Sequence, residues 1–438
     1  MNSEKKSVAT PPSPNSARTG RGDPSLRFLA APLNAPVVQR AIDFFHKHPA
    51  DSPDKFDVVL GPTTGWRTVA KLAVRLSSGC LRIGLFAPGT HELLEIPQCR
   101  AHHPRINSAV NVLQKKCRRL HIPPYDENTG TGNLGHVLIH VERATGRQQV
   151  TLVWNENDHH GRDSPALLRQ LCDDLIQSCG NKHNDQLHLH SLWVHYNNSS
   201  KFDNSIVDRD GRWEQRFGDS VALVEILDVA APHLQVPLFF PPQVFRQANI
   251  DAFSAIVTNI RYWIQQRQKQ APISRALELY GGVGTIGLHL VDLFSRSLVS
   301  SDENPFNKEC FQRTLDQLRV KEPARMCKKV RYEAKSAADM VLDDEPKDDV
   351  TKAELVVVDP PRKGLDSQVL DAICHSQNFA HLHSLVYVSC GFEAFCRDFE
   401  TLTIGGGWKL DFAEGHLLFP GSDAIETLAF FTRKTTAS

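Results

Sequence analysis

A cysteine stands at the point where a strand is predicted to end. Residues 384–390, "SLVYVSC", form a run of β-branched and aromatic side chains that closes on Cys390, and such a run is typical of a buried strand. A thiolate at the end of a strand can attack an electrophilic carbon and form a covalent intermediate. The alternative is inert packing, because buried cysteine is common in cores and the chain has ten cysteines.

Polar groups follow three other predicted strands. In "RALELYGGVGT", residues 275–285, a strand runs into a glycine-rich turn, where the backbone can approach a ligand closely. Asp302 follows the next strand, about 20 residues on, where an acidic residue can hold a ribose hydroxyl pair; a helix N-cap is the alternative. Asp359 and Arg362 follow a strand of valines in "VVVDPPRKGL". Ligands of open parallel sheets bind beyond the carboxyl ends of the strands, so we expect one shared site.

The elements that would position these groups change character near the middle of the chain. In the second half, apolar strands alternate with helices, which predicts a mainly parallel sheet covered on both faces. In the first half, short alternating runs and helical patterns at 104–119 and 164–178 predict an α+β domain. The beginning is rich in Ser, Pro and Gly, which is typical of disorder. We expect a disordered tail over 1–35, an α+β domain over 36–240 and an α/β domain over 241–438.

The motifs resemble class I S-adenosylmethionine methyltransferases, and more narrowly the RNA (uracil-5-)-methyltransferase family of the TrmA and RumA type. The likeness is strong over about 240–438 and weak upstream. It rests on four motifs: "DPPRKGL" at 359–365, "YVSC" at 387–390, "FPGSDAIET" at 419–427 and "FRQAN" at 245–249. It implies an α/β, Rossmann-like class I methyltransferase domain with an N-terminal α+β RNA-binding domain.

The resemblance implies a covalent reaction at carbon 5 of a uridine. Carbon 5 is a poor nucleophile, and a thiolate that adds at carbon 6 turns the ring into an enolate that can attack a methyl group. A base must then remove the proton on carbon 5. Cys390 fits as the nucleophile and Glu426 as the base, and we expect Arg362 to help place or polarise the base.

The resemblance also implies S-adenosyl-L-methionine as the cofactor. Asp302 would hold its ribose, and Asp359 and Gln247 would lie near its methionine end. Ser336 is expected beside the adenine. The full set of implied cofactor contacts is Gln247, Tyr280, Thr285, Asp302 and Asp359.

Three positions depart from the family pattern. Gly391 and Phe392 stand where the family usually has Asn-Pro after the nucleophile, and loss of the Asn side chain puts the efficiency of catalysis in doubt. Gly281 replaces a frequent Cys, an exchange that we expect to be harmless. Residues 423–425, Asp-Ala-Ile, precede the base where the family often has His, so the base is expected to be tuned differently.

RNA is the implied partner, and we expect tRNA, with rRNA as the alternative. Two basic runs, at 115–119 and 325–331, are candidates for phosphate contact; solvated surface is the alternative for each. The cations in these runs are Lys115, Lys116, Arg118 and Arg119 in the first, and Arg325, Lys328, Lys329 and Arg331 in the second. Trp66, Arg67 and Lys71 are further candidates, because aromatic side chains stack on unpaired bases. The target base must leave its stack to reach Cys390.

The composition of the 438-residue chain narrows these choices. Lys plus Arg and Asp plus Glu both number 50, which argues against a surface that is cationic throughout. No apolar run reaches the roughly 18 residues of a membrane span, so we expect no membrane partner. We also expect a monomer. The cysteines form neither Cys-x-x-Cys pairs nor clusters, which argues against zinc and iron–sulfur sites and so favours tRNA over the iron–sulfur, rRNA-specific branch. Scattered cysteines suit an intracellular compartment: cytoplasm, nucleus or an organelle.

Two histidine-rich stretches could suggest a metal site, and two alternative functions stay open. The histidines of 188–195 alternate as on one face of a strand, so we expect no metal there or in "NDHHGR". An RNA cytosine-5 methyltransferase would tend to have a cysteine after the paired prolines, where Arg362 stands. A non-catalytic RNA-binding or RNA-folding protein on the same fold remains the rival from another class.

Overall fold

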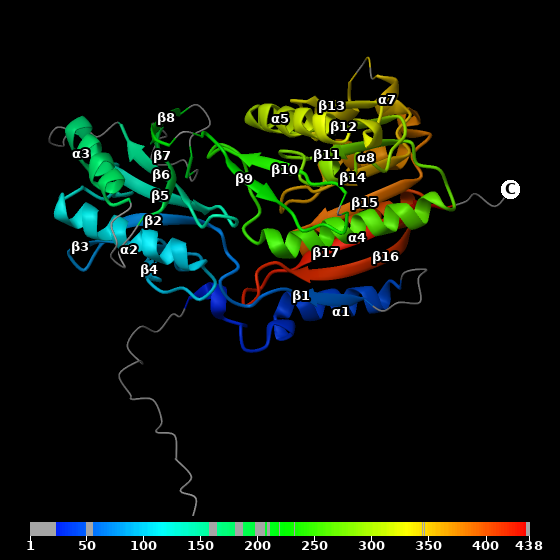
Figure 1. Ribbon diagram of the computed structural model, residues 1–438. Helices are drawn as coiled ribbons and strands as arrows, with labels where there is room; N and C mark the ends of the chain where they lie inside the picture. The colour runs from blue at the N-terminus through cyan, green and yellow to red at the C-terminus, as the bar shows by residue number, and fades with distance from the viewer. Residues whose placement is uncertain are drawn as a thin grey trace, which may run out of the picture.

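Two mixed sheets organise the protein, which we describe from a computed structural model (Figure 1). The structure describes residues 23–49, 56–156, 164–179, 187–197, 206–207, 211–218, 220–231, 233–343, 345 and 347–434. The helices of these residues are α1 (Pro36–Lys47), α2 (Pro104–Arg119), α3 (Ser164–Gln177), α4 (Ile250–Gln268), α5 (Phe306–Lys321), α6 (Ala337–Val341), α7 (Asp348–Thr351), α8 (Ser367–His375) and α9 (Phe392–Glu400).

The larger sheet lies in the C-terminal half and has the strand order β1-β16-β17-β15-β14-β11-β12-β13. β11 to β15 run parallel, and β17 is antiparallel to both of its neighbours. The strands are β1 (Asp57–Leu60), β11 (Arg275–Leu279), β12 (Ser297–Ser301), β13 (Lys329–Glu333), β14 (Leu355–Val358), β15 (Ser384–Ser389), β16 (Trp408–Leu417) and β17 (Glu426–Arg433).

Burial on both faces explains the continuous apolar runs of this sheet. In β15, Val386 and Val388 belong to the core on one face, while Leu385 and Tyr387 belong to the core on the other. Residues of α4 and α5 pack into the first core, and residues of α1, α8 and α9 into the second. A strand buried on both faces shows no polar alternation, so the predicted α/β, Rossmann-like architecture is confirmed.

The smaller sheet has the strand order β4-β3-β2-β5-β6-β7-β8. Its strands are β2 (Val69–Ser77), β3 (Cys80–Phe86), β4 (Leu93–Glu95), β5 (Leu134–Val141), β6 (Gln148–Asn155), β7 (Leu189–Asn197) and β8 (Arg212–Phe217), and the hairpin of β9 (Leu223–Ile226) and β10 (Pro237–Phe240) follows. α2 and α3 contribute to the core of this sheet, so the helices expected at 104–119 and 164–178 are present.

Two elements of the expected N-terminal domain, 36–240, pack with the C-terminal sheet instead. β1 pairs in parallel with β16, and α1 packs into the core of the C-terminal sheet, although both lie within the expected domain 36–240. In Figure 1 the blue α1 accordingly lies beside β16. Local sequence patterns predict a strand but not its pairing partner, because the partner lies more than 300 residues away.

The expected disordered tail, 1–35, is ordered in its last part. Residues 1–22 lie outside the described residues, whereas Phe28 donates its backbone N–H to the Gly421 carbonyl at 2.7 Å. Leu26 packs against the N-terminal core and Phe28 against the C-terminal core. These two apolar anchors hold a segment whose composition by itself is typical of disorder.

None of the helices described here is both long and apolar enough for a bilayer crossing.

Candidate active site

One cavity lies beyond the carboxyl ends of β11, β12, β14 and β15. Its volume is about 540 Å³, within the range of small-molecule sites. The cavity brings together the candidate residues from seven separate parts of the chain: Gln247, Tyr280, Thr285, Asp302, Ser336, Asp359, Arg362, Cys390 and Glu426. The topology therefore places the predicted nucleophile, base and cofactor contacts around a single space.

The glycine-rich turn after β11 forms one wall. Tyr280, the first residue after the strand, has a φ of 59°, and Gly282 and Gly284 also have positive φ, a region that glycine adopts without steric cost. The Tyr280 hydroxyl donates to the Asp366 carboxylate at 2.9 Å, which ties this turn to the loop after β14. The unusual backbone of Tyr280 is thus held by a side-chain hydrogen bond at its far end.

Asp302 joins the turn after β12 to the glycine-rich turn. Its carboxylate accepts from the Gly282 N–H at 3.1 Å and from the Asn304 N–H at 2.9 Å. Pro305, not Asp302, occupies the N-cap position of α5, so the N-cap alternative is wrong. Asp302 also lines the cavity.

Buried carboxylates give the cavity an excess of negative charge. Burial, followed by the charges of Glu278 and Asp302, raises the pKa of Asp359 to about 7. Burial also raises the pKa of Glu278 to about 7, although Ser300 and the Gly287 N–H donate hydrogen bonds to it. A ligand with positive charge would relieve this repulsion. These carboxylates therefore fit S-adenosylmethionine, which carries a sulfonium and an ammonium group.

Cys390 and Glu426 lie next to each other across the sheet. Ser389 of β15 pairs with Thr427 of β17, which makes the two residues neighbours at the edge of the cavity. Burial, then the charges of Glu426 and Asp359, raises the pKa of the Cys390 thiol to about 11, and the Arg362 guanidinium opposes the shift. Glu426 is itself buried, and this burial, followed by the Asp359 charge, raises the pKa of Glu426 well above its usual range.

The structure gives physical reasons for two departures from the family pattern. A Cβ on Gly391 would lie 2.3 Å from the carbonyl oxygen of Arg362, so the loop after β14 leaves no room for a side chain there. A Cβ on Gly281 would lie 2.4 Å from the Ser300 hydroxyl, which takes the space of a side chain at that position.

Sequence reasoning missed several residues of the cavity wall. Phe245 lies at the cavity with 68% of its surface exposed, and Phe419 and the buried Glu278 also line it. The signal for Phe245 was its place in the "FRQAN" motif, two residues before Gln247. An exposed aromatic ring at a cavity edge can stack on a base.

The predicted role of Trp66 in stacking on RNA is wrong for this conformation. Trp66 is only 4% exposed and packs edge-on against Phe419, with ring centroids 5.5 Å apart. The Arg67 guanidinium lies over the Trp66 and Phe419 rings, at 5.0 and 5.3 Å from their centroids. These residues join the N-terminal domain to the cavity wall. Lys71 is exposed on β2.

In both basic runs, some cations already pair with acceptors of the protein itself. Arg118 donates to the Leu81 carbonyl, and Arg119 forms an ion pair with Asp174. In the second run, Lys329 and Arg331 both pair with the Asp349 carboxylate at 2.7 Å. Fewer cations are therefore available for phosphate contact than the sequence predicts.

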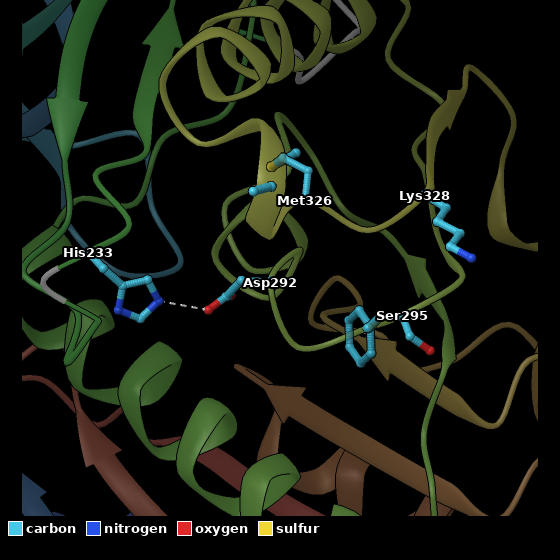
Figure 2. Close-up of a pocket in the computed structure, with 7 residues that line it drawn as sticks. His233, Asp292, Ser295, Met326 and Lys328 are labelled. Atoms are coloured by element: carbon cyan, nitrogen blue, oxygen red, sulfur yellow. Dashed lines mark hydrogen bonds and ion pairs between the residues drawn. The ribbon is translucent and has the colours of Figure 1, made fainter.

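A second hollow of about 560 Å³ lies at the opposite end of the strands, before β12 and β13 begin. Figure 2 shows the His233 ring facing the Asp292 carboxylate, and the two are 3.0 Å apart. Arg261 also donates to Asp292, at 2.6 and 2.8 Å. His233 and Arg261 thus both pair with Asp292. Lys328, one of the candidates for phosphate contact, also lines this hollow, whereas the predicted catalytic and cofactor residues line the other cavity. Across the described ranges, no group of three His, Cys, Asp or Glu side chains is placed to hold a metal ion.

Comparisons with known proteins point in one direction. No family model matches the chain. An uncharacterised RNA methyltransferase of Protochlamydia amoebophila is 36% identical over 374 residues, covering 85% of this chain and 87% of that protein. The 23S rRNA (uracil(747)-C(5))-methyltransferase RlmC of a Shewanella species is 23% identical, covering 86% of both chains. In structure, the chain is similar to the tRNA (uracil-54, C5)-methyltransferase of Pyrococcus abyssi, solved with S-adenosyl-L-homocysteine. That likeness has a TM-score of 0.59 at 19% identity and covers 86% of this chain and 79% of that one.

Proposed function

This chain belongs to the RNA (uracil-5-)-methyltransferase family of S-adenosylmethionine-dependent enzymes, and from that premise we propose how its own residues carry the reaction. Cys390 acts as the nucleophile, Glu426 as the base, and a uridine of tRNA as the substrate. The observation that carries the proposal is the single cavity that Cys390 and Glu426 share with all five predicted cofactor contacts.

The chemistry begins at the sulfur of Cys390. Its thiolate forms a bond to carbon 6 of the uracil, and carbon 5 becomes nucleophilic. S-adenosylmethionine, when bound, supplies an electrophilic methyl group. Glu426 then takes the proton from carbon 5; the electrons of that C–H bond restore the double bond between carbons 5 and 6, and the C–S bond breaks to release Cys390.

The electrostatics of the site support this order of events. In the free protein, burial and then the neighbouring carboxylates raise the pKa of Cys390 and favour its neutral thiol, which is a weak nucleophile. Burial and, after it, negative charge raise the pKa of both Cys390 and Glu426, and a cationic ligand beside Asp359 would offset the part that is due to charge. Cofactor binding would thus favour the ionised forms that the two proposed roles require.

Cofactor binding is proposed for residues on three sides of the cavity. Asp302 would accept hydrogen bonds from the ribose hydroxyls. It also holds the glycine-rich turn by accepting from the Gly282 N–H. Gln247 and Asp359 would lie toward the methionine end, with Tyr280 and Thr285 along the wall between them and Ser336 beside the adenine.

The choice of tRNA rests on the cysteines. Their spacing contains no cluster of the kind that holds iron–sulfur centres in the rRNA-specific branch. The similar proteins include both an rRNA enzyme and a tRNA enzyme, so 23S rRNA is the alternative substrate to test.

The test is a trap for the covalent intermediate. The protein is incubated with S-adenosylmethionine and tRNA that contains 5-fluorouridine, because fluorine blocks the final removal of the group on carbon 5. We expect a protein–RNA band on a denaturing gel from the natural protein and from Cys396→Ala, the matched control on α9, but not from Cys390→Ala. A band that persists in Cys390→Ala would disprove the assigned nucleophile. Absence of any band with tRNA and with 23S rRNA fragments, while RNA still binds, would favour the non-catalytic RNA-binding alternative.

A further inference from the structure

The segment from residue 23 to residue 47 contacts both loops that carry the proposed nucleophile and base. We propose that this N-terminal segment is a positioning element for the reaction: it holds the base loop through Asp423 and the nucleophile loop through Phe392. The inference rests on the proposed roles of Cys390 and Glu426.

The contact with the base loop begins at Asp423, three residues before Glu426. The Asp423 carboxylate accepts from the backbone N–H of Val37, in the first turn of α1, at 2.8 Å. The local N-cap residue of α1, Ala35, makes no side-chain cap, and the first amides of a helix need an acceptor. A residue 386 positions away thus supplies the cap, and its negative charge suits a helix N-terminus.

A second contact lies two residues earlier in the same loop. Gly421 accepts from the Phe28 N–H at 2.7 Å. A Cβ on Gly421 would lie 2.5 Å from the Ser25 carbonyl oxygen, so the N-terminal segment passes directly against the loop backbone. The loop also carries Phe419, which lines the cavity. The base loop is therefore held between the N-terminal segment and the cavity.

The contact with the nucleophile loop is aromatic. Phe44 of α1 packs edge-on against Phe392, two residues after Cys390, with ring centroids 5.8 Å apart. Phe44 also meets Phe399 at 5.1 Å, so one ring touches the start and the end of α9. Phe392 is one of the two residues that depart from the family's Asn-Pro, and here it supplies the surface that α1 covers.

These contacts predict that the two ends of α1 affect different steps. Asp423→Ala releases the base loop, so removal of the carbon-5 proton slows while addition of Cys390 to carbon 6 continues. The covalent protein–RNA adduct should then accumulate on ordinary uridine RNA, by about tenfold over the natural protein. Phe44→Leu loosens the nucleophile loop, so formation of the adduct with 5-fluorouridine RNA should slow by about tenfold.

The conservative variant separates positioning from charge. In Asp423→Asn the amide oxygen can still accept from Val37, so we expect turnover within about threefold of the natural protein and no accumulated adduct. Val38→Ala is the matched control, since Val38 is fully buried in the same helix and its N–H donates to Ala35 rather than to a catalytic loop. All variants are assayed below their unfolding temperatures, and the KM for S-adenosylmethionine should stay within about twofold, because the cofactor wall is untouched.

The result that would overturn the inference is an Asp423→Ala protein that unfolds earlier but leaves as little adduct on ordinary uridine RNA as Val38→Ala does. If Asp423→Ala fails to fold, Phe44→Leu decides: an unchanged rate of adduct formation with 5-fluorouridine RNA would refute the positioning role. Failure of the proposed function itself is distinguishable, because the natural protein would then form no adduct with either RNA.

Discussion

Gly391, which follows the proposed nucleophile, lies against the backbone carbonyl of Arg362, in the loop that follows β14. A Cβ on Gly391 would be 2.3 Å from that carbonyl oxygen and 3.1 Å from the Arg362 Cα. Contacts this short with backbone atoms cannot be relieved by a side-chain rotation. The glycine thus lets two loops of the cavity pass in van der Waals contact, where the family usually has an asparagine.

Restoring that asparagine should harm this protein. We expect Gly391→Asn, and also Gly391→Ala, to cost about 1–3 kcal/mol of stability, because the loop after β14 must shift. The shift moves Arg362 relative to Cys390, so adduct formation should slow as well. Thermal unfolding and the rate of trapping on 5-fluorouridine RNA measure the two effects. Gly405→Ala is the control, since a Cβ there meets nothing within 4 Å; a Gly391→Asn enzyme faster than the natural protein would contradict this reading.

The reactivity of Cys390 should respond in opposite directions to two substitutions. Burial raises the pKa of the thiol, the charge of Glu426 adds to this shift, and the charge of Arg362 opposes it. Glu426→Gln should therefore speed the alkylation of Cys390 by iodoacetamide at a given pH, and Arg362→Gln should slow it. Peptide mass spectrometry after timed alkylation of the free protein, between pH 7 and pH 9, measures the rate at Cys390 alone. Shifts of both variants in the same direction would mean that charge does not control this thiol.

The stability of the free protein should carry a signature of its buried carboxylates. Asp359 has an ordinary pKa of 3.8 in the unfolded chain and about 7 in the folded protein, so the folded state binds more protons between these values. Its contribution to stability is therefore lost as pH rises from about 4 to about 7. Buried histidines act in the opposite sense, as His140 does with a folded pKa of about 3. Comparing the stability of the natural protein with that of a variant that lacks the Asp359 carboxylate separates its effect from that of the histidines.

Asp359→Asn is that variant. Relative to the natural protein, it should gain stability as pH rises from about 4 to about 7, because the amide has no proton to lose. Urea unfolding at pH 5 and at pH 8 measures the difference. Asp366→Asn serves as the control: Lys363 lowers the pKa of that carboxyl below its ordinary 3.8, so it is ionised at both pH values and its stability difference should not change between them. A stability difference between Asp359→Asn and the natural protein that does not change with pH would contradict the buried charge.

Substitution of Phe245 should weaken RNA methylation without changing the stability of the fold. Its ring is 68% exposed at the cavity, and stacking on a base is worth about 1–3 kcal/mol. Phe245→Ala should lower kcat/KM for RNA by about five- to 150-fold and change stability by less than about 0.5 kcal/mol. Tyr262→Ala is the matched control, because Tyr262 is 63% exposed on α4 and is not part of the cavity wall. Equal effects of the two variants on RNA methylation would remove Phe245 from the RNA contact.

The sequence by itself determined the alternation of strands and helices in the C-terminal half and the chemistry at the strand ends. Both follow from local information. A strand such as β15 is apolar along its whole length because helices cover both faces of the sheet. Cys390 and Asp359 could be placed at one edge because parallel strands end on the same side. The residues for which the resemblance implied a role line the same cavity for that reason.

Only the tertiary structure decided which distant segments meet. Nothing local to residues 23–47 indicates that they pack on the catalytic loops, since Asp423 caps α1 across 386 residues. The local sequence also did not predict that Trp66 packs against Phe419. Nor did it predict that Lys329 and Arg331 pair with Asp349. Each depends on a side chain brought in by the fold from another element, and a local pattern of residue types carries no information about such a partner.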